Sequence, residues 1–186
     1  MLKGEGMEQR IFGKPLINPV DLQRRIAKLG HQISHDYVRK DLVLVGVLKG
    51  AFAFYADLAR AISIPLTVDF LVVTSNAGSA NKKVKIVSDL TVDIKGRDVL
   101  LVEDIIDSGL TARFLLKRLE EREPGSLKIC AMLDKPSRRK TDVKIDYTGF
   151  SIPNKFVVGF GLDHHNNYRN LPYLAVLDQL QDVDRG

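Results

Sequence analysis

The feature that most constrains the fold is the stretch from Asp98 to Arg113, in which a strand pattern leads through a polar loop into a helix pattern. Val99 to Val102 form a short, uninterrupted apolar run, which is typical of a strand buried on both faces of a parallel sheet. After the loop, apolar residues recur at helical spacing until Pro124-Gly125 ends the pattern, at Ala112, Leu115, Leu116 and Leu119. A buried strand that leads into a helix predicts an α/β fold with a mainly parallel sheet.

The loop carries three acids, Glu103, Asp104 and Asp107, followed by the segment Ser108-Gly109-Leu110-Thr111. At a helix N-terminus, free backbone N–H groups, the helix dipole and nearby hydroxyls favour a bound anion. Acids suit such a site where the ligand also brings ribose hydroxyls and Mg²⁺. Because neighbouring side chains on an ideal strand point to opposite faces, Glu103 and Asp104 can share a ligand only if the strand bends there. The alternative is a strand-to-helix turn with solvated acids.

This stretch resembles the phosphoribosyl-diphosphate (PRPP) signature of type I phosphoribosyltransferases, and Glu-Asp-Ile-Ile-Asp-Ser-Gly-Leu-Thr at 103–111 is similar to the hypoxanthine-guanine branch. The resemblance extends from about Leu44 to Leu177. It implies a twisted, mainly parallel sheet with helices on both faces, in a single domain over residues 1–186. A small hood lobe would come from the N-terminal segment and about residues 135–186. The implied function is purine salvage: transfer of 5-phosphoribosyl from PRPP to hypoxanthine or guanine, giving IMP or GMP plus pyrophosphate.

The resemblance also assigns roles to individual residues. Glu103 and Asp104 would hold the ribose hydroxyls and, together with Asp163, Mg²⁺ as the cofactor. Asp107 would approach the purine N7 as general base or proton carrier. The other implied contacts are to pyrophosphate at Leu48, Lys49, Gly50 and Arg169, to the 5′-phosphate at Ser108, Gly109, Leu110 and Thr111, and to the purine at Lys135, Phe156 and Val157.

In the implied purine pocket, Lys135 would donate to the 6-oxo group and Phe156 would stack on the ring. The backbone carbonyl of Val157 would accept from the 2-amino group of guanine. Without the resemblance, Lys135 would be interpreted as a surface lysine and Phe156 as a core aromatic residue.

Two loops also gain a role from the resemblance. In the family, a non-proline cis peptide often precedes the lysine equivalent to Lys49; from the residues alone, Lys49-Gly50 would merely end a strand. Family members also carry a mobile lid, expected here at Ser75 to Lys83. Its closing contacts should differ, because Ser75-Asn76 stands in place of the usual Ser-Tyr pair.

The other elements follow from periodicity. A first helix is predicted to begin at Asn18-Pro19, with one buried stripe at Leu22, Ile26, Leu29, Ile33 and Tyr37. A second helix follows Lys49-Gly50, with its inner face at Ala51, Phe54, Tyr55, Leu58 and Ile62. Further strands are expected at residues 42–48, 65–74, 84–87, 127–133, 156–158 and 174–176.

Several polar groups are predicted to have no catalytic role. His31 and His35 are four residues apart but lack a third ligand nearby, so they are interpreted as surface histidines. His164-His165 are interpreted as pocket-rim residues, because adjacent side chains converge poorly on one metal ion. Arg138-Arg139-Lys140 is interpreted as a solvated turn, with nucleic-acid contact as a minor alternative.

Composition narrows the setting of the protein. The 186 residues suit one domain, and the single cysteine, Cys130, rules out an internal disulfide and agrees with a reducing cytosol. No apolar run approaches the roughly 20 residues of a membrane span, and the N-terminus lacks the apolar core of a signal peptide, so a cytoplasmic protein without a membrane partner is expected. The net charge of +5 suits an anionic substrate but also RNA.

Two rival functions remain open at this stage. One is an RNA-binding regulator of the pyrimidine-operon type on the same fold, which the basic charge favours slightly and the purine-pocket residues disfavour. The other is a non-catalytic nucleotide sensor, which Asp107 argues against. Relatives commonly form dimers or tetramers, so a homo-oligomer is expected.

Overall fold

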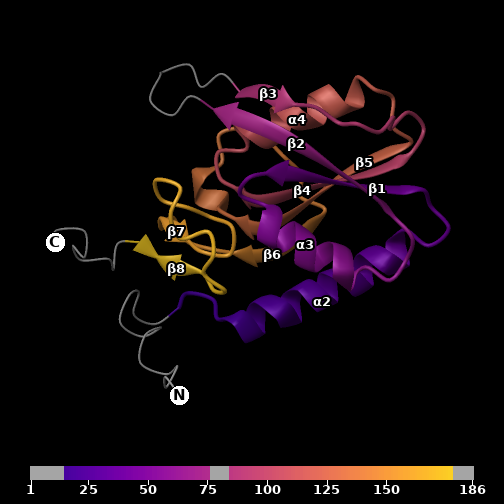
Figure 1. Cartoon of the computed structure of the whole chain (residues 1–186). Coiled ribbons are helices and arrows are strands. Elements are labelled where there is room, and N and C mark those ends of the chain that lie inside the picture. The colour runs from indigo at the N-terminus through magenta and orange to yellow at the C-terminus, as the bar shows by residue number, and fades with distance from the viewer. Residues whose placement is uncertain (1–14, 76–83, 178–186) are drawn as a thin grey trace.

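The main body of the protein is a six-stranded sheet with the strand order β3-β2-β1-β4-β5-β6 (Figure 1). The computed structural model describes residues 15–75 and 84–177. The strands are β1 (Leu42–Leu48), β2 (Thr67–Ser75), β3 (Val84–Ser88), β4 (Asp98–Ile106), β5 (Ser126–Asp134) and β6 (Tyr147–Ser151). All neighbours pair in parallel except β2 and β3, which are antiparallel. The predicted mainly parallel sheet is confirmed.

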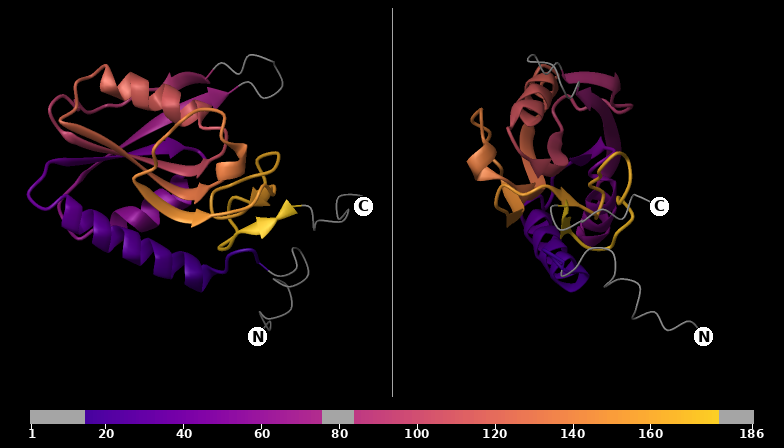
Figure 2. Two further views of the ribbon diagram at one scale, coloured as in Figure 1. Left: turned by 180° about the vertical axis from the view of Figure 1, so that it is seen from behind. Right: turned by 90° about the vertical axis from the view of Figure 1, so that its left-hand side faces the viewer.

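In the described part of the chain, helices cover both faces of this sheet, as Figures 1 and 2 show. The helices α2 (Pro19–Asp36) and α3 (Phe52–Ala61) pack on one face, and α4 (Leu110–Glu120) packs on the other. Side chains of the central strands alternate between these two layers: Leu44 joins the core under α2 and α3, whereas Val43 joins the core under α4. The central strands β1 and β4 are therefore apolar on both faces, which explains their uninterrupted apolar runs.

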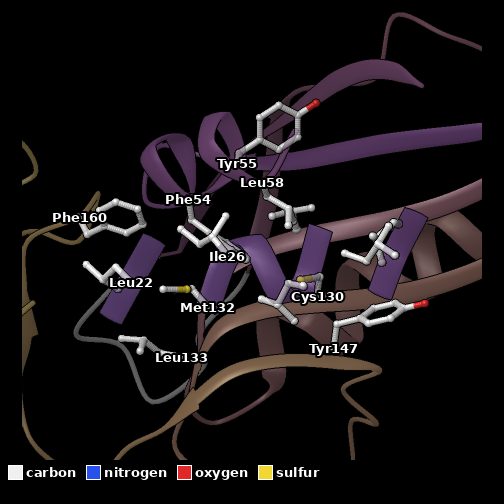
Figure 3. Packing of buried hydrophobic residues seen from close by; sticks show 14 of the residues in the cluster. Leu22, Ile26, Phe54, Tyr55, Leu58, Cys130, Met132, Leu133, Tyr147 and Phe160 are labelled. Carbon is white, nitrogen blue, oxygen red and sulfur yellow. The ribbon is translucent and has the colours of Figure 1, made fainter. Parts of the chain in front are cut away.

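The helix α2 begins where the sequence predicts. The Asn18 side chain accepts a hydrogen bond from the backbone N–H of Asp21 at 2.9 Å, and Pro19 occupies the first turn. Its predicted stripe is fully buried, and Leu22 and Ile26 pack with Phe54 of α3 and Met132 of β5 (Figure 3). The helix thus fixes α3, and with it the loop that precedes α3, against the sheet.

A small antiparallel unit stands beside the end of the main sheet at which β2 ends (Figures 1 and 2). It consists of β7 (Val157–Val158) and β8 (Ala175–Val176). An isolated bridge between Ile17 and Leu174 joins the two described ends of the chain beneath it. This arrangement brings residues near both ends of the chain to the same edge of the sheet.

The strand β6 was not predicted from the sequence. Its segment Tyr147–Ser151 contains a central glycine and shows little alternation, so no strand pattern stands out. The strand forms because β5 supplies its parallel partner and Arg25 of α2 supplies extra donors: Arg25 Nε donates to the Gly149 carbonyl at 2.8 Å, and a second Arg25 nitrogen donates to the Thr148 carbonyl. These contacts are long-range, so local sequence does not reveal them.

No helix within residues 15–75 and 84–177 combines the length and apolar character needed to cross a membrane. Cys130 is a free, buried thiol, and burial raises the pKa of that thiol. His31 and His35 are exposed on α2, as predicted.

Candidate active site

The acids of β4 lie at a bend in the strand. Before them, Leu100 and Val102 pack under α2 and α3, and residues 99 and 101 pack under α4. After them the alternation is reversed, because Ile105 packs on the α2 side and Ile106 on the α4 side. The ladder with β5 also has no pair between Glu103–Ala131 and Ile105–Leu133. The strand therefore bends at Glu103-Asp104, which is the condition under which the two side chains can share a ligand.

Both carboxyl groups line one cavity, where Glu103 is buried and Asp104 is partly buried. Glu103 is 5% exposed, and its pKa is raised well above the ordinary value, first by burial and then by the charge of Asp104. Burial raises the pKa of Asp104 to about 6, although its carboxylate accepts a hydrogen bond from the Ile105 N–H at 2.8 Å. Negative charge is thus unfavourable here until a cation or a set of hydrogen-bond donors arrives.

The N-terminus of α4 is open to an anion. Gly109 precedes the helix with a φ of +81°, and the first helical hydrogen bond runs from the Arg113 N–H to the Gly109 carbonyl at 2.9 Å. The N–H groups of Leu110, Thr111 and Ala112 come before that bond, and the only side chain that caps one of them is Ser108, at 3.4 Å from the Leu110 nitrogen, within residues 15–75 and 84–177. By contrast, Asn18 caps the N-terminus of α2 and Asp21 lies in its first turn.

The cavity has a volume of about 270 Å³ and joins the bend to this helix N-terminus. Its walls include eight of the predicted site residues: Leu48, Gly50, Glu103, Asp104, Asp107, Ser108, Gly109 and Thr111. They also include apolar residues that the sequence did not single out, namely Val47, Val73, Ile105, Ile106 and Ala112. The remaining predicted residues lie outside its walls: Lys49, Leu110, Lys135, Phe156, Val157, Asp163 and Arg169.

The loop after β1 approaches the acids without a side chain between them. The Leu48–Lys49 peptide is cis, as predicted. A Cβ atom added to Gly50 would overlap the carboxylate of Asp104, and a Cβ added to Gly161 would overlap the Gly50 carbonyl. Three segments far apart in the sequence therefore meet at this point: the loop after β1, the bend in β4 and the loop after β7.

Asp163 and Arg169 form a pair beside the acids. Arg169 makes an ion pair with Asp163 at 2.7 Å and donates to the Gly161 carbonyl at 2.7 Å, so it is fixed to the loop that packs on Gly50. Both charges reach Asp104: Arg169 lowers and Asp163 raises the pKa of that carboxyl, after the larger effect of burial. The predicted pyrophosphate and metal residues are thus neighbours.

On the opposite side, Lys135 is buried rather than on the surface. Its residue is 8% exposed, and burial lowers the pKa of its ammonium group, while Asp107 acts in the other direction. Phe156, in contrast, is 48% exposed, and its ring is nearly perpendicular to that of His164, with the two ring centres 5.5 Å apart. The core-aromatic alternative for Phe156 is wrong, because nearly half of the residue is exposed, and an exposed aromatic ring can stack on a planar ligand.

The backbone carbonyl of Val157 points away from its partner strand. In the antiparallel β7–β8 ladder, the Leu177 N–H donates to the Phe156 carbonyl at 2.8 Å, and Val157 is opposite Val176. Hydrogen-bonded and non-hydrogen-bonded pairs alternate along such a ladder, so Val157–Val176 is a non-hydrogen-bonded pair. The Val157 carbonyl is therefore directed outward from the ladder, where it can accept a hydrogen bond from a ligand.

The interpretation of Arg138-Arg139-Lys140 as a solvated turn is wrong for Arg139, whose side chain is 19% exposed, whereas Arg138 is exposed and makes a surface ion pair. Arg138 Nε makes an ion pair with Asp107 at 3.0 Å, and Arg139 donates to the Asp107 carbonyl at 2.7 Å and to the Asp134 carboxylate. The signal that could have found them is topological. They follow the end of β5, and β5 lies next to β4, so their loop must lie beside the loop that carries Asp107.

The carboxylates of the site suit Mg²⁺ only if substrate phosphates and water supply the other ligands of the ion. Among residues 15–75 and 84–177, no group of three or more His, Cys, Asp or Glu side chains is arranged to hold a metal ion. Mg²⁺, however, commonly binds through one or two carboxylates, substrate phosphates and water. Glu103 and Asp104 offer buried carboxylates beside a helix N-terminus that favours phosphate, so the residues present fit that chemistry. Of the predicted lid, from Ser75 to Lys83, Ser75 is the last residue of β2, and residues 76–83 lie outside the described residues.

Comparison with known proteins agrees with this geometry. A model of the phosphoribosyl transferase domain matches residues 20–165. The hypoxanthine phosphoribosyltransferase of Salmonella typhimurium is 49% identical over 164 residues, which cover 86% of this chain and 92% of that protein. The hypoxanthine-guanine phosphoribosyltransferase of Mycobacterium tuberculosis is 47% identical over 171 residues, which cover 88% of this chain and 85% of that protein.

Solved structures agree as well. The crystal structure of a hypoxanthine phosphoribosyltransferase from Staphylococcus aureus matches with a TM-score of 0.89 and 38% identity, covering 97% of this chain and 100% of that one. A structure of the Trypanosoma cruzi hypoxanthine phosphoribosyl transferase, from work on the role of its C-terminal region in oligomeric state and activity, matches with a TM-score of 0.86 and 36% identity, covering 90% of this chain and 92% of that one. The chain therefore belongs to the phosphoribosyl transferase family and has the type I phosphoribosyltransferase fold.

Proposed function

We propose that this protein is a hypoxanthine-guanine phosphoribosyltransferase of purine salvage, which converts PRPP and a 6-oxopurine into IMP or GMP and pyrophosphate. The observation that carries the proposal is the single cavity in which the bent acid pair of β4 meets the open N-terminus of α4. One ligand that needs both anion donors and hydroxyl acceptors is a phosphorylated ribose. The names of the relatives at 47–49% identity support the same reaction.

In this reaction a purine ring nitrogen forms a bond to C1′ of the ribose while the bond from C1′ to the pyrophosphate oxygen breaks. Positive charge develops on the ribose, and negative charge develops on the leaving group. Glu103 and Asp104 accept hydrogen bonds from the ribose hydroxyls, and Asp107 takes the proton from the purine N7. The loop of residues 108–111 binds the 5′-phosphate, and Leu48, Lys49, Gly50 and Arg169 contact the pyrophosphate.

Bound Mg²⁺ would neutralise charge on the diphosphate as it leaves. Glu103, Asp104 and Asp163 are the carboxylates that would hold it. The raised pKa values of Glu103 and Asp104 support this role, because a buried carboxyl pair without a nearby cation resists ionisation. Asp163 already has a cationic partner in Arg169. Of the three carboxylates, it is therefore the one that would have to exchange an ion pair for the metal.

The base is selected by donor and acceptor chemistry. Lysine ammonium is a donor without an acceptor, so Lys135 suits the oxygen of a 6-oxopurine and opposes the amino group of adenine. Its burial makes an unpaired state costly. The exposed ring of Phe156 supplies a stacking surface, and the outward carbonyl of Val157 accepts from the amino group of guanine.

The RNA-binding alternative has less support. Its signal in the sequence was the net basic charge. Two of the basic residues, Arg138 and Arg139, are paired with Asp107 and Asp134. Backbone phosphates of RNA would have to compete with these carboxylates. The relatives reported above are named as purine enzymes rather than as regulators.

The setting of the protein is part of the proposal. The chain forms one domain over residues 1–186, with its hood lobe around β7, β8 and the bridge to Ile17. It acts in the cytoplasm as a homodimer or homotetramer. Support for assembly comes from the Trypanosoma cruzi relative, whose C-terminal region was studied for its part in the oligomeric state.

The test is to incubate the purified protein with PRPP, Mg²⁺ and each free base, and to identify the nucleotides by chromatography. IMP and GMP should form readily, and AMP should form slower by about 10⁴-fold, as in sites that leave a buried donor unpaired with the wrong base. The variant Lys135→Gln should lose much of this preference, since an amide offers either a donor or an acceptor. Lys144→Gln is the matched control, because Lys144 is 86% exposed and pairs only with Asp146 among the described residues. AMP formation at a rate comparable to IMP would refute the purine-pocket assignment.

A further inference from the structure

The segment after β5 encloses the 107–111 loop from its outer side. Lys140 N–H donates to the Ser108 carbonyl at 3.0 Å, and Arg139 Nη1 donates to the Asp107 carbonyl at 2.7 Å. Arg113 of α4 in turn donates to the Thr141 hydroxyl at 2.6 Å. Two consecutive carbonyls of the loop are therefore bound by one neighbouring segment.

These contacts determine which way the loop amides point. In a trans peptide unit the C=O and N–H groups point in opposite directions. The Asp107 carbonyl shares its peptide unit with the Ser108 N–H, and the Ser108 carbonyl shares its unit with the Gly109 N–H. With both carbonyls held on the outer side, both N–H groups are directed toward the cavity that these residues line. The same contacts keep two carbonyl dipoles away from a bound anion, which they would repel.

In this segment, the side chain of Arg139 is largely buried and is held by hydrogen bonds. Its side chain is only 19% exposed, and its two terminal nitrogens bind different acceptors, the Asp107 carbonyl and the Asp134 carboxylate. The Arg139 Cδ also lies 3.2 Å from the position that a Cβ on Gly109 would occupy. Asp134 is itself fixed opposite Ile106 in the β4–β5 ladder. The planar fork of a guanidinium matches this pair of acceptors, and a lysine ammonium does not.

We propose that Arg139 is a positioning residue for the 5′-phosphate loop: it acts through the Asp107 carbonyl to present the Ser108 and Gly109 amides to the phosphate. This inference rests on the proposed function in so far as the ligand is a ribose phosphate. Arg138 differs in kind, because its side chain is 49% exposed and contacts the Asp107 carboxylate rather than the backbone. Arg139 therefore binds the loop backbone, whereas Arg138 binds the side chain of Asp107.

The first measurement is binding of ribose 5-phosphate by calorimetry, which needs no turnover. The variant Arg139→Gln should weaken binding by roughly 10- to 100-fold, the range for a lost hydrogen bond that supports a charged ligand. Arg139→Lys keeps the charge and the aliphatic stem but lacks the planar fork of the guanidinium. This variant should bind ribose 5-phosphate about as weakly as Arg139→Gln. The matched control Arg118→Gln removes an exposed arginine of α4 that pairs with Glu121, and it should bind like the parent protein.

The second measurement is steady-state kinetics of the same variants. Because the 5′-phosphate is remote from the reacting atoms, the KM for PRPP should rise about as much as the dissociation constant of ribose 5-phosphate, with the KM for the base unchanged. Full binding and kinetics in a folded Arg139→Lys variant would overturn the positioning role, since charge alone would then suffice. If the parent protein made IMP but Arg139→Gln bound ribose 5-phosphate normally, this inference would fail while the proposed function stood. A parent protein that bound ribose 5-phosphate yet made no nucleotide would refute the proposed function instead.

Discussion

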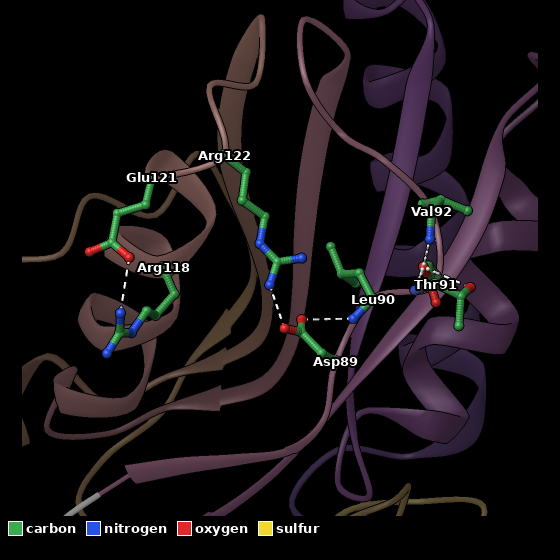
Figure 4. A network of polar contacts seen from close by, with 8 residues as sticks. Asp89, Leu90, Thr91, Val92, Arg118, Glu121 and Arg122 are labelled. Atoms are coloured by element: carbon green, nitrogen blue, oxygen red, sulfur yellow. Dashed lines mark hydrogen bonds and ion pairs between the residues drawn. The ribbon is translucent and has the colours of Figure 1, made fainter.

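Two groups of buried carboxylates on the same sheet have opposite surroundings. Asp69 of β2 accepts hydrogen bonds from the backbone N–H groups of Phe70, Thr91 and Val92 at 2.7–2.9 Å and from the Thr91 hydroxyl at 3.2 Å. Figure 4 shows Thr91 and Val92 next to each other, with a dashed hydrogen bond at the backbone nitrogen of Val92. The acids of β4, Glu103 and Asp104, face a cavity, and the Ile105 N–H supplies one donor, to Asp104.

The pKa values follow the difference in donors. Burial would raise the pKa of Asp69, but the hydrogen bonds from Val92, Phe70 and Thr91 outweigh it, and the net shift is downward. At Glu103 and Asp104, burial dominates, and the shift is upward. The protein can thus satisfy a buried carboxylate completely with its own backbone where the carboxylate holds a loop in place. At the site it leaves the oxygens for a ligand, which is consistent with the tendency of functional sites to be less stable than the rest of the fold.

Metal removal should give the largest effect on activity, because it leaves the charge of the leaving diphosphate and of the carboxylates that would hold the ion without a counter-ion. In excess EDTA, activity should fall to background, and Mg²⁺ should restore it better than Ca²⁺, because the smaller ion holds phosphate and carboxylate oxygens in a tighter octahedral geometry. Nucleotide formation measured with each ion is the assay. Thermal unfolding under the same conditions is the control: removing the metal should leave the segment held by Asp69 intact. Full activity without a divalent ion would contradict the role given to Glu103, Asp104 and Asp163.

Loss of the proton acceptor should come next in size. Asp107→Ala should lower turnover by roughly 10²–10⁴-fold, the usual range for a positioned acid–base group. Binding of PRPP should change less, because the 108–111 loop binds through backbone groups. Asp69→Asn provides the matched control, since it alters a buried carboxylate that does not line the cavity. A folded Asp107→Ala protein with normal turnover would remove this residue from the mechanism.

For stability, the order should be reversed: a change at Asp69 should cost more free energy of unfolding than a change at Glu103. Asp69→Ala leaves three backbone donors without their acceptor and should lower the free energy of unfolding by about 3 kcal/mol. Glu103→Gln removes a charge that the fold disfavours, so stability should stay equal or rise by up to about 1 kcal/mol while activity falls. Urea unfolding of both variants in metal-free buffer would measure this. If Glu103→Gln were the more destabilised of the two, the contrast drawn between β2 and β4 would be incorrect.

The smallest effect should appear on the acid side of the pH profile. Because the pKa of Asp69 is lower in the folded protein than its ordinary value of 3.8, its contribution to stability is present above that value and is lost as the pH falls through the folded pKa. The stability difference between the parent protein and Asp69→Asn should therefore be constant above about pH 5 and shrink below about pH 4. Unfolding curves recorded across this range test the sign. A difference that grew with acidity would contradict it.

The sequence was sufficient wherever the cause of a structure is local. The apolar runs of β1 and β4, the Asn18 cap and the helix stripe of α2 were all predicted, because period, burial and capping act over a few residues. The family resemblance added the cis peptide before Lys49 and the correct sheet. Strand geometry alone predicted that Glu103 and Asp104 share a ligand only if the strand bends there, and the reversed alternation of Ile105 and Ile106 shows that bend.

The misses have long-range causes. The strand β6 depends on Arg25, 124 residues from Gly149, and Arg139 depends on the Asp107 carbonyl 32 residues away. A run of basic residues in isolation is most simply interpreted as solvated, and nothing within a few positions of Arg139 indicates otherwise. Lys135 and Phe156 were also misjudged from local pattern alone, in opposite directions, because burial is decided by which loops meet at the end of the sheet.

The contact of Gly50 with Asp104 and of Gly161 with the Gly50 carbonyl limits the substitutions that evolution or a mutant library can explore. At either position even a single methyl group is excluded, since the added Cβ would overlap another atom. The two positions lie 111 residues apart in the sequence. At Gly161 the overlap is with the Gly50 backbone, so relief would displace the loop after β1; at Gly50 it is with the Asp104 side chain, so relief would displace an acid of the site. A selection for growth on purine salvage should therefore return only glycine at both positions, and a compensating pair of changes there should be absent from any library of double variants.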